Sequence, residues 1–346
     1  MLIEKEHEII SPYTYYLIKE RYLAMTKLIL ILAVSFGGLL AGYLFKLLCE
    51  YYGLLNFEKL NLLSGNLKTI ALLFMYPIAI INSFWKLSIS DVSFLILPII
   101  GLIPLLLGST SAHFLSRKFK ILPSKSASIY ISGMCTNQGS FGGLLAFFLL
   151  GDQGYFYLQL FIILEIVLYY ILGFPVSSDI SKGSTRLLHF NFQTLTEKPV
   201  SLIPIAAIFA GILLNSTHIY HPSFMDTVAA FFIPATTAAN CLAIGMTLQL
   251  GTVKDYYKEI SLVFIAKYLI NPMIVLPLTY ILVIKGVITL LAFKVLVILV
   301  FMPVGFTALL APILYNFDLD LSNSIWITTT LTSLFVFIPV LYLILS

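Results

Sequence analysis

A short polar and glycine-rich stretch interrupts an apolar segment that is otherwise long enough to cross a membrane. It contains Asn137, Gln138, Gly139 and Ser140, and two further glycines follow Phe141. Glycine costs about 1 kcal/mol per position against alanine inside a helix, so the stretch favours an interruption of the helix. An interruption frees backbone N–H and C=O groups, and the amide side chains add more donors and acceptors. Such groups could bind a small solute at membrane depth.

A second interruption is predicted far along the chain, at Pro303, Val304 and Gly305, again in the middle of an apolar segment. Proline lacks the N–H that a helix interior needs. Two interrupted spans in corresponding positions of two halves point to the binding site of a secondary transporter. If the spans cross, half-helix N-termini suit an anion, whereas C-terminal carbonyls suit a cation or a neutral donor. The alternative is tight packing, because small residues let helices approach closely.

Three polar residues lie deep in other apolar segments. A charge such as Glu165 or Lys267 costs about 2.5–3.5 kcal/mol at the centre of a span, so such residues usually pair or line a water path. If these two face each other, they could share a proton or form an ion pair. The alternatives are a purely structural salt bridge, or a Lys267 side chain that extends to the headgroups. Asn271 lies one turn beyond Lys267 on the same face, so it is a further candidate for this site.

The composition indicates an integral membrane protein. Of the 346 residues, 60% are hydrophobic and 10% are charged, whereas soluble domains carry about 25% charged residues. No basic cluster with interleaved aromatic residues indicates a nucleic-acid partner. Cys49, Cys135 and Cys241 form no motif for a disulfide framework, and we expect no metal and no cofactor. Because no catalytic constellation occurs at membrane depth, we do not expect an enzyme.

Crossing the hydrocarbon core of a bilayer takes about 20 helical residues. Sliding this length along the chain predicts an all-α polytopic membrane protein with ten transmembrane helices. We expect the spans at 28–48, 67–84, 93–115, 127–150, 155–178, 200–215, 226–249, 260–283, 290–314 and 324–345.

Basic residues are distributed unevenly between the predicted loops. Loops that follow odd-numbered spans hold ten lysines and arginines, and the others hold two. The positive-inside rule then places the basic loops in the cytoplasm and both termini outside. The protein would be a multi-pass protein of the cell membrane, which is the inner membrane if the source is bacterial.

The chain is expected to divide into two repeats. After a lead-in at 1–26, a first five-helix repeat would occupy 27–178, a cytoplasmic linker 179–199, and a second five-helix repeat 200–346. Because each half has an odd number of spans, the second copy would be inverted. The interruptions would fall in helices 4 and 9, which gives a 5+5 inverted repeat with crossed broken helices.

In the fourth predicted span, Asn137, Gly139 and Gly142 precede a leucine- and phenylalanine-rich helix and a glycine-containing turn at 149–154. This pattern resembles the auxin efflux carrier family of membrane transporters, which occurs in bacteria and eukaryotes. The family's pattern also contains a proline after the second glycine, and Leu144 occupies that position in this sequence. Later stretches are similar to the family's seventh, ninth and tenth spans, namely 243–248, 302–303 and 328–331.

The resemblance implies a fold like that of bile-acid/sodium symporters and NhaA-type sodium/proton antiporters. Spans 1, 2, 6 and 7 would form a scaffold, and spans 3–5 and 8–10 a transport domain that moves against it. The implied substrate is auxin or another small organic anion, with protons or sodium as the coupling ion. Glu165 and Lys267 occupy places similar to the acid–lysine pair of the antiporter branch. The scaffold helices could also join two copies in a homodimer.

We therefore expect a secondary active transporter that moves a small organic anion across the lipid bilayer by alternating access. Glu165, Lys267 and Asn271 would be the coupling or stabilising residues. One alternative is a cation/proton antiporter or sodium symporter of the same fold, for which paired acids would be expected. Another is a membrane sensor that keeps the carrier fold and transports nothing. The predicted substrate-binding residues are Asn137, Gln138, Gly139, Ser140, Pro303, Val304 and Gly305.

Overall fold

The computed structural model describes residues 25–86, 95–193, 202–248 and 253–345. Within these ranges the chain is helical, and the only strand-like feature is one isolated β-bridge. The chain is an all-helical, multi-pass membrane protein, as the composition predicted. The predicted lead-in at 1–26, except its last two residues, and residues 194–199 of the predicted linker at 179–199 lie outside the described residues. Among the described residues, seven helices are long and apolar enough to cross a membrane: Met25–Tyr52, Glu58–Lys86, Leu97–Lys118, Gln138–Ser181, Phe224–Thr247, Val253–Ile284 and Leu319–Leu345.

Many of the long helices are runs of α segments joined by π or 3₁₀ segments. The first part of the chain contains η1 (Ala33–Gly37), α2 (Gly38–Tyr52), α3 (Phe57–Ile70), η2 (Ala71–Met75), α4 (Tyr76–Lys86), α5 (Leu97–Lys118), α6 (Pro123–Met134), η4 (Gln138–Gly142), α7 (Gly143–Ile162), α8 (Glu165–Leu168), η5 (Tyr169–Gly173) and α9 (Phe174–Ser181). The second part contains α11 (Ile203–Ser216), α12 (Phe224–Thr247), η7 (Val253–Tyr256), α13 (Tyr257–Phe264), η8 (Ile265–Ile270), α14 (Asn271–Ile284), α15 (Leu290–Val300), η9 (Phe306–Leu309), α16 (Leu310–Tyr315), α17 (Leu319–Thr332), η10 (Ser333–Phe337) and α18 (Ile338–Leu345).

The second helix begins well before the predicted boundary at 67. Asn56 is its N-cap, since its side-chain oxygen accepts the Lys59 N–H at 3.0 Å. Glu58 lies in the first turn, where a negative charge stabilises the positive end of the helix. The helix therefore starts at Phe57, and Lys68 lies in its interior instead of at its beginning.

The stretch from Gln138 to Ser181 is helical nearly throughout, but it is not one straight rod. Gly151 has φ 69° and ψ −162°, which is outside the helical region, and glycine adopts such a conformation without a Cβ clash. A straight helix of 44 residues would extend about 66 Å, more than twice the hydrocarbon thickness of about 30 Å. The turn at Gly151 falls between the predicted fourth and fifth spans.

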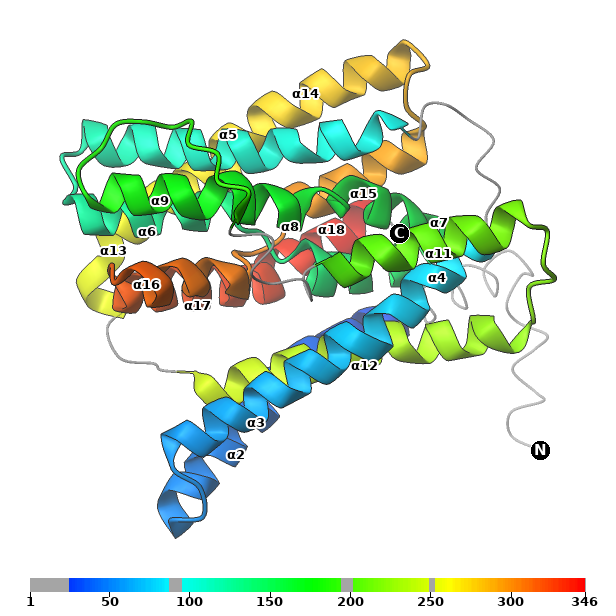
Figure 1. The fold of residues 1–346 in the computed structure, drawn as a ribbon, viewed down its shortest axis with the longest axis horizontal. Coiled ribbons are helices and arrows are strands. Elements are labelled where there is room, and N and C mark those ends of the chain that lie inside the picture. The colour runs from blue at the N-terminus through cyan, green and yellow to red at the C-terminus, as the bar shows by residue number, and fades with distance from the viewer. Residues whose placement is uncertain (1–24, 87–94, 194–201, 249–252, 346) are drawn as a thin grey trace, which may run out of the picture.

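The helices pack mainly within two groups. In the first, here called the α12 group, α12 packs along α2, α3 and α4, and α11 packs along α4. Figure 1 shows α2, α3 and one end of α12 extending together away from the other helices. Gly42 and Gly245 lie at the contact of α2 with α12, where a Cβ on either would overlap the backbone of the opposite helix. The absence of side chains therefore permits this close approach.

The second group contains both interrupted segments and is here called the interruption group. It consists of α5 to α9 and α13 to α18, with their π and 3₁₀ segments. Gly108 and Gly133 bring α5 and α6 together in the same way, because a Cβ on either would meet the backbone oxygen of the other. The core of buried apolar side chains lies mostly in this group, so the interruptions are held in a packed environment.

Candidate functional site

Both predicted interruptions are present, and they pair with each other. The first separates α6, which ends at Met134, from η4, and the second separates α15, which ends at Val300, from η9. The Asn137 N–H donates to the Pro303 carbonyl at 2.8 Å, and the Gly305 N–H donates to the Cys135 carbonyl at 3.1 Å. These bonds surround an antiparallel bridge between Thr136 and Val304. Backbone groups that each helix loses at its interruption are thus satisfied by the other interruption.

The amide side chains at the first interruption remain free. Asn137 is half-buried and Gln138 is buried, with 2% of its surface exposed. Neither side chain forms a hydrogen bond within the described part of the chain. Buried amides are normally hydrogen-bonded. The structure therefore leaves the hydrogen-bonding groups of these two side chains without a protein partner, and their role in binding a substrate stays a prediction.

A chain of hydrogen bonds joins Lys267 to Glu165 through the first interruption. Lys267 is 1% exposed, and its ammonium donates to the Thr136 hydroxyl at 2.6 Å. The Thr136 N–H donates to the Tyr169 hydroxyl at 2.9 Å, and that hydroxyl donates to the Glu165 carboxylate at 2.6 Å. Lys267 and Glu165 are therefore connected indirectly, through Thr136 of the interruption and the Tyr169 hydroxyl.

No ion pair joins Glu165 directly to Lys267 among the residues that the structure describes. The sequence placed these two charges in one site but missed the two residues between them. Tyr169 lies four residues after Glu165, which is one helical turn, and Thr136 immediately precedes Asn137. Their spacing from Glu165 and Asn137 is the only sequence signal for these two residues. The residue types give none, because threonine and tyrosine are common in apolar helices.

Asn271 makes a helix-to-helix contact. Its side-chain N–H donates to the Pro104 carbonyl of α5 at 2.9 Å, so it does not bond to either interruption. Its side-chain oxygen is buried and has no hydrogen-bond partner in the described ranges. The structure therefore brings Lys267 to the interruption but turns Asn271 towards another helix.

Polar bonds also connect the first interruption to the α12 group. The Asn240 side chain donates to the Ser140 hydroxyl at 3.0 Å, and the Thr237 hydroxyl donates to the Ser140 carbonyl at 3.1 Å. Tyr76 of α4 donates to the Gln159 side-chain oxygen of α7 at 3.0 Å. Ser140 thus lies where the two groups of helices meet, which is a suitable place for a group that contacts a solute between them.

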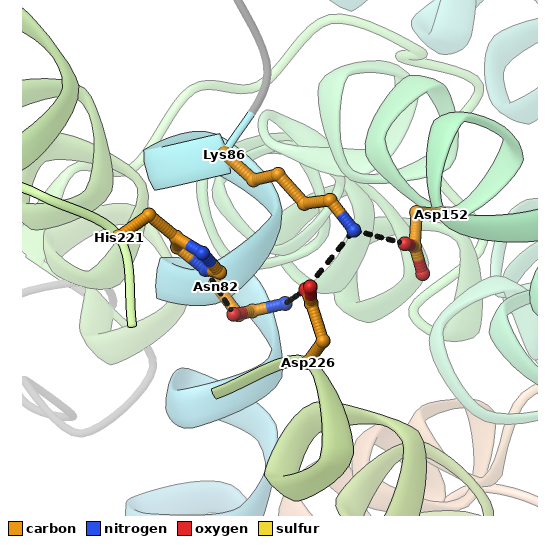
Figure 2. A network of polar contacts seen from close by, with 5 residues as sticks. All are labelled: Asn82, Lys86, Asp152, His221 and Asp226. Carbon is orange, nitrogen blue, oxygen red and sulfur yellow. Dashed lines mark hydrogen bonds and ion pairs between the residues drawn. The ribbon is translucent and has the colours of Figure 1, made fainter. Parts of the chain in front are cut away.

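A charged network ties the two groups together near the ends of their helices (Figure 2). The Lys86 ammonium, at the end of α4, lies 2.8 Å from a carboxylate oxygen of Asp152 and 3.1 Å from one of Asp226. Asp152 follows the turn at Gly151, and Asp226 lies in the first turn of α12. The Asn82 side chain donates to Asp226 at 3.3 Å and accepts from the His221 ring at 2.8 Å. The ion pair of Lys86 with Asp152 therefore links the α12 group to the interruption group at this end.

We expect a measurable but small coupling between Lys86 and Asp152. Exposed ion pairs contribute about 0–1 kcal/mol, and salt screens them. A double-mutant cycle of Lys86→Met and Asp152→Asn, read from unfolding in detergent, should give a coupling of about 0.5–1 kcal/mol at low salt. The coupling should fall when salt is raised. Pairing Lys86→Met with Asp179→Asn, which removes the partner of His189 instead, is the control and should give none. A coupling that salt leaves unchanged would contradict this account.

The fold and the paired interruptions define a class of protein: a polytopic helical membrane protein whose two broken helices meet among buried side chains. No protein-family model matches the chain. It is similar to an uncharacterized transporter of Methanothermobacter thermautotrophicus, with 23% identity over 296 residues that cover 85% of this chain and 91% of the relative. This similarity and the membrane-helical architecture support a transporter and point away from an enzyme.

Proposed function

We propose that the protein is a secondary active transporter that moves a small organic anion across the membrane by alternating access. The observation that carries the proposal is the mutual hydrogen bonding of the two interruptions, Asn137 to Pro303 and Gly305 to Cys135. Broken helices that meet inside a bundle are the arrangement by which many transporters expose helix ends to a solute. The resemblance to auxin efflux carriers agrees with this class of substrate.

Ten membrane crossings account for the helices better than seven. The turn at Gly151 divides the 44-residue stretch, and its first part would continue α6 across the first interruption. The shorter apolar helix Ile203–Ser216 would be the sixth span. Leu290–Val300 and Phe306–Tyr315 together would form the ninth span around the second interruption. The breaks then occupy the fourth span of each half, which supports the proposed 5+5 inverted repeat.

The α12 group would be the scaffold, and the interruption group would be the transport domain. The packing supports this division, because the proposed spans 1, 2, 6 and 7 all belong to the α12 group. The interruptions lie in the other group, so a solute bound there would move with it. The excess of basic residues in alternate loops would place both termini outside.

The proposed substrate site comprises residues of both interruptions and the start of the helix that follows the first one. Asn137, Gln138, Gly139 and Ser140 would contribute free amides and the start of one half-helix, and Pro303, Val304 and Gly305 would contribute backbone beside the other. Half-helix N-termini carry partial positive charge, which favours an anion. Glu165 and Lys267 would be the coupling residues, since a proton that moves on either changes the hydrogen bonds of Thr136.

Uptake by purified protein in proteoliposomes is the test. A panel of radiolabelled small carboxylates should be offered with no gradient, with a pH gradient and with a sodium gradient. We expect at least one carboxylate to accumulate faster than in protein-free liposomes and to be stimulated by one gradient. The alternative cation antiporter would instead move sodium or protons without any carboxylate. A protein that moves none of these solutes under any gradient would contradict the proposed function.

A further inference from the structure

A cavity of about 440 Å³ lies between the two groups of helices, beside the second interruption. Its walls come from α3, from the end of α12, and from η9, α16 and α17. Pockets for small ligands have volumes of about 300–1,000 Å³, so this one is large enough for a small solute. It is separate from the charged network of Figure 2, which involves α4 and the first turn of α12.

A lysine without an acidic partner lies in this cavity. The Lys68 ammonium of α3 is 3.4 Å from the centre of the Phe306 ring, over its face. No acidic side chain pairs with Lys68 in the described parts of the chain. A cation beside aromatic and aliphatic side chains loses hydration, and the attraction of the ring recovers only part of it. Lys68 therefore has no counterion from the described residues, and the cavity has room for an anion beside it.

Other features of the cavity also favour a negative ligand. Phe306 begins the second half-helix, Phe306–Tyr315, whose N-terminal end adds partial positive charge next to Lys68. Trp326 lines the cavity, although its indole N–H is itself buried. Asn61 and Asn323 contribute amides, whereas most of the remaining wall is apolar. The cavity thus combines one cation, amide groups and a hydrophobic wall.

We propose that this cavity binds a small monoanion with an apolar body, and that Lys68 holds its anionic group. The inference rests on the proposed function and adds to it a cationic residue and a location that the sequence did not indicate. A carboxylate of a free solute and the phosphate of a lipid headgroup share this chemistry. The apolar body would lie against Leu309, Leu310 and Ile313, and Phe306 connects the bound anion to Gly305 of the interruption.

Tryptophan fluorescence can report occupancy directly, because the chain has only two tryptophans and Trp326 lines the cavity. In a Trp85→Phe background, 4-bromobenzoate should quench Trp326 in a saturable manner, since bromine quenches indole on contact. The dissociation constant should rise roughly tenfold or more in Lys68→Met, as expected for loss of a charge-assisted bond. Lys68→Arg should restore most of the binding, and the neutral 4-bromobenzamide should not distinguish the variants.

Lys59→Met is the matched control, because Lys59 lies on the same helix but is exposed and does not line the cavity. It should bind 4-bromobenzoate like the parent. Equal affinities of the parent, Lys68→Met and Lys59→Met would overturn the inference. Nanodiscs with and without phosphatidylglycerol separate the two sources of the anion. Displacement of the probe by phosphatidylglycerol would assign the site to a lipid headgroup and overturn a free solute as its occupant.

Equilibrium binding also keeps this inference distinct from the proposed function. Carboxylate uptake that is unaffected by Lys68→Met, together with unchanged quenching, would overturn the role of Lys68 and leave the transporter proposal standing. Binding that depends on Lys68 without any uptake would overturn the transporter proposal and support the anion site.

Discussion

Gly305→Ala should reduce the initial rate of carboxylate uptake by roughly tenfold or more, because overpacking at a tight contact costs about 1–3 kcal/mol. A Cβ at this position would lie 2.9 Å from the Thr136 carbonyl oxygen and 3.0 Å from its carbon. These are backbone atoms of the opposite interruption, so they cannot rotate away as a side chain would. The two interruptions would have to separate, which removes the arrangement on which the proposed site depends.

The matched control for Gly305→Ala is Gly142→Ala, at the end of η4, which follows the first interruption. A Cβ there would meet only side-chain atoms, the nearest being Leu299 Cδ2 at 3.1 Å. Flexible side chains can move by a few tenths of an ångström, so Gly142→Ala should retain most of the uptake. Both variants should be compared in proteoliposomes and by thermal unfolding in detergent. Uptake at the wild-type rate by a correctly folded Gly305→Ala protein would show that the close approach is not required for transport.

Glu165→Gln should abolish stimulation of uptake by a pH gradient while carboxylate binding is retained. Glutamine keeps the size of the side chain and can still accept from the Tyr169 hydroxyl, but it cannot gain or lose a proton.

Thr136→Val should disturb the Lys267 end of the same hydrogen-bond chain, because it removes the acceptor of the buried Lys267 ammonium. Leaving such a charged donor unsatisfied costs about 1–3 kcal/mol or more, so uptake should fall roughly tenfold in this variant.

Glu58→Gln is the control for charge removal, since Glu58 is exposed in the first turn of α3. It should leave both the basal rate and the gradient response unchanged. The measurement is uptake with and without an imposed pH gradient, with binding followed separately by Trp326 fluorescence. A Glu165→Gln protein that still responds to the gradient would remove Glu165 from the coupling mechanism. Its role would then be limited to fixing Tyr169.

The interruptions were predictable because they depend on local chemistry. Glycine, proline and amide residues in the middle of an apolar segment disfavour a continuous helix wherever the segment lies in the fold. The helical membrane architecture was predictable for the same reason, since apolar length alone indicates it. What the sequence could not show is that Asn137 and Pro303 bond to each other, because that contact depends on the packing of two distant segments.

Polar residues of the site were harder to predict, for identifiable reasons. Lys68 gives no signal in the sequence, because the polar residues between 57 and 66 lower the hydrophobicity at the start of α3 and place Lys68 near the predicted end of the span. Asn271 was grouped with Lys267 by helical spacing, but the structure pairs it with Pro104 of a third helix. A spacing of four residues shows that two side chains lie on the same face of one helix. It does not show which neighbouring helix each side chain contacts.

The contrast between the two ends of the molecule has an energetic consequence. Lys86 and its two carboxylates link the groups of helices at one end, whereas the cavity beside Lys68 separates them at another place. If the groups move during transport, the link between Lys86 and Asp152 must open. Because such an exposed contact contributes only about 0–1 kcal/mol, it would change the ratio of two conformers by about fivefold at most. This ion pair therefore does little to fix one orientation, and the buried contacts of Ser140 with Asn240 and Thr237 would have to rearrange as well.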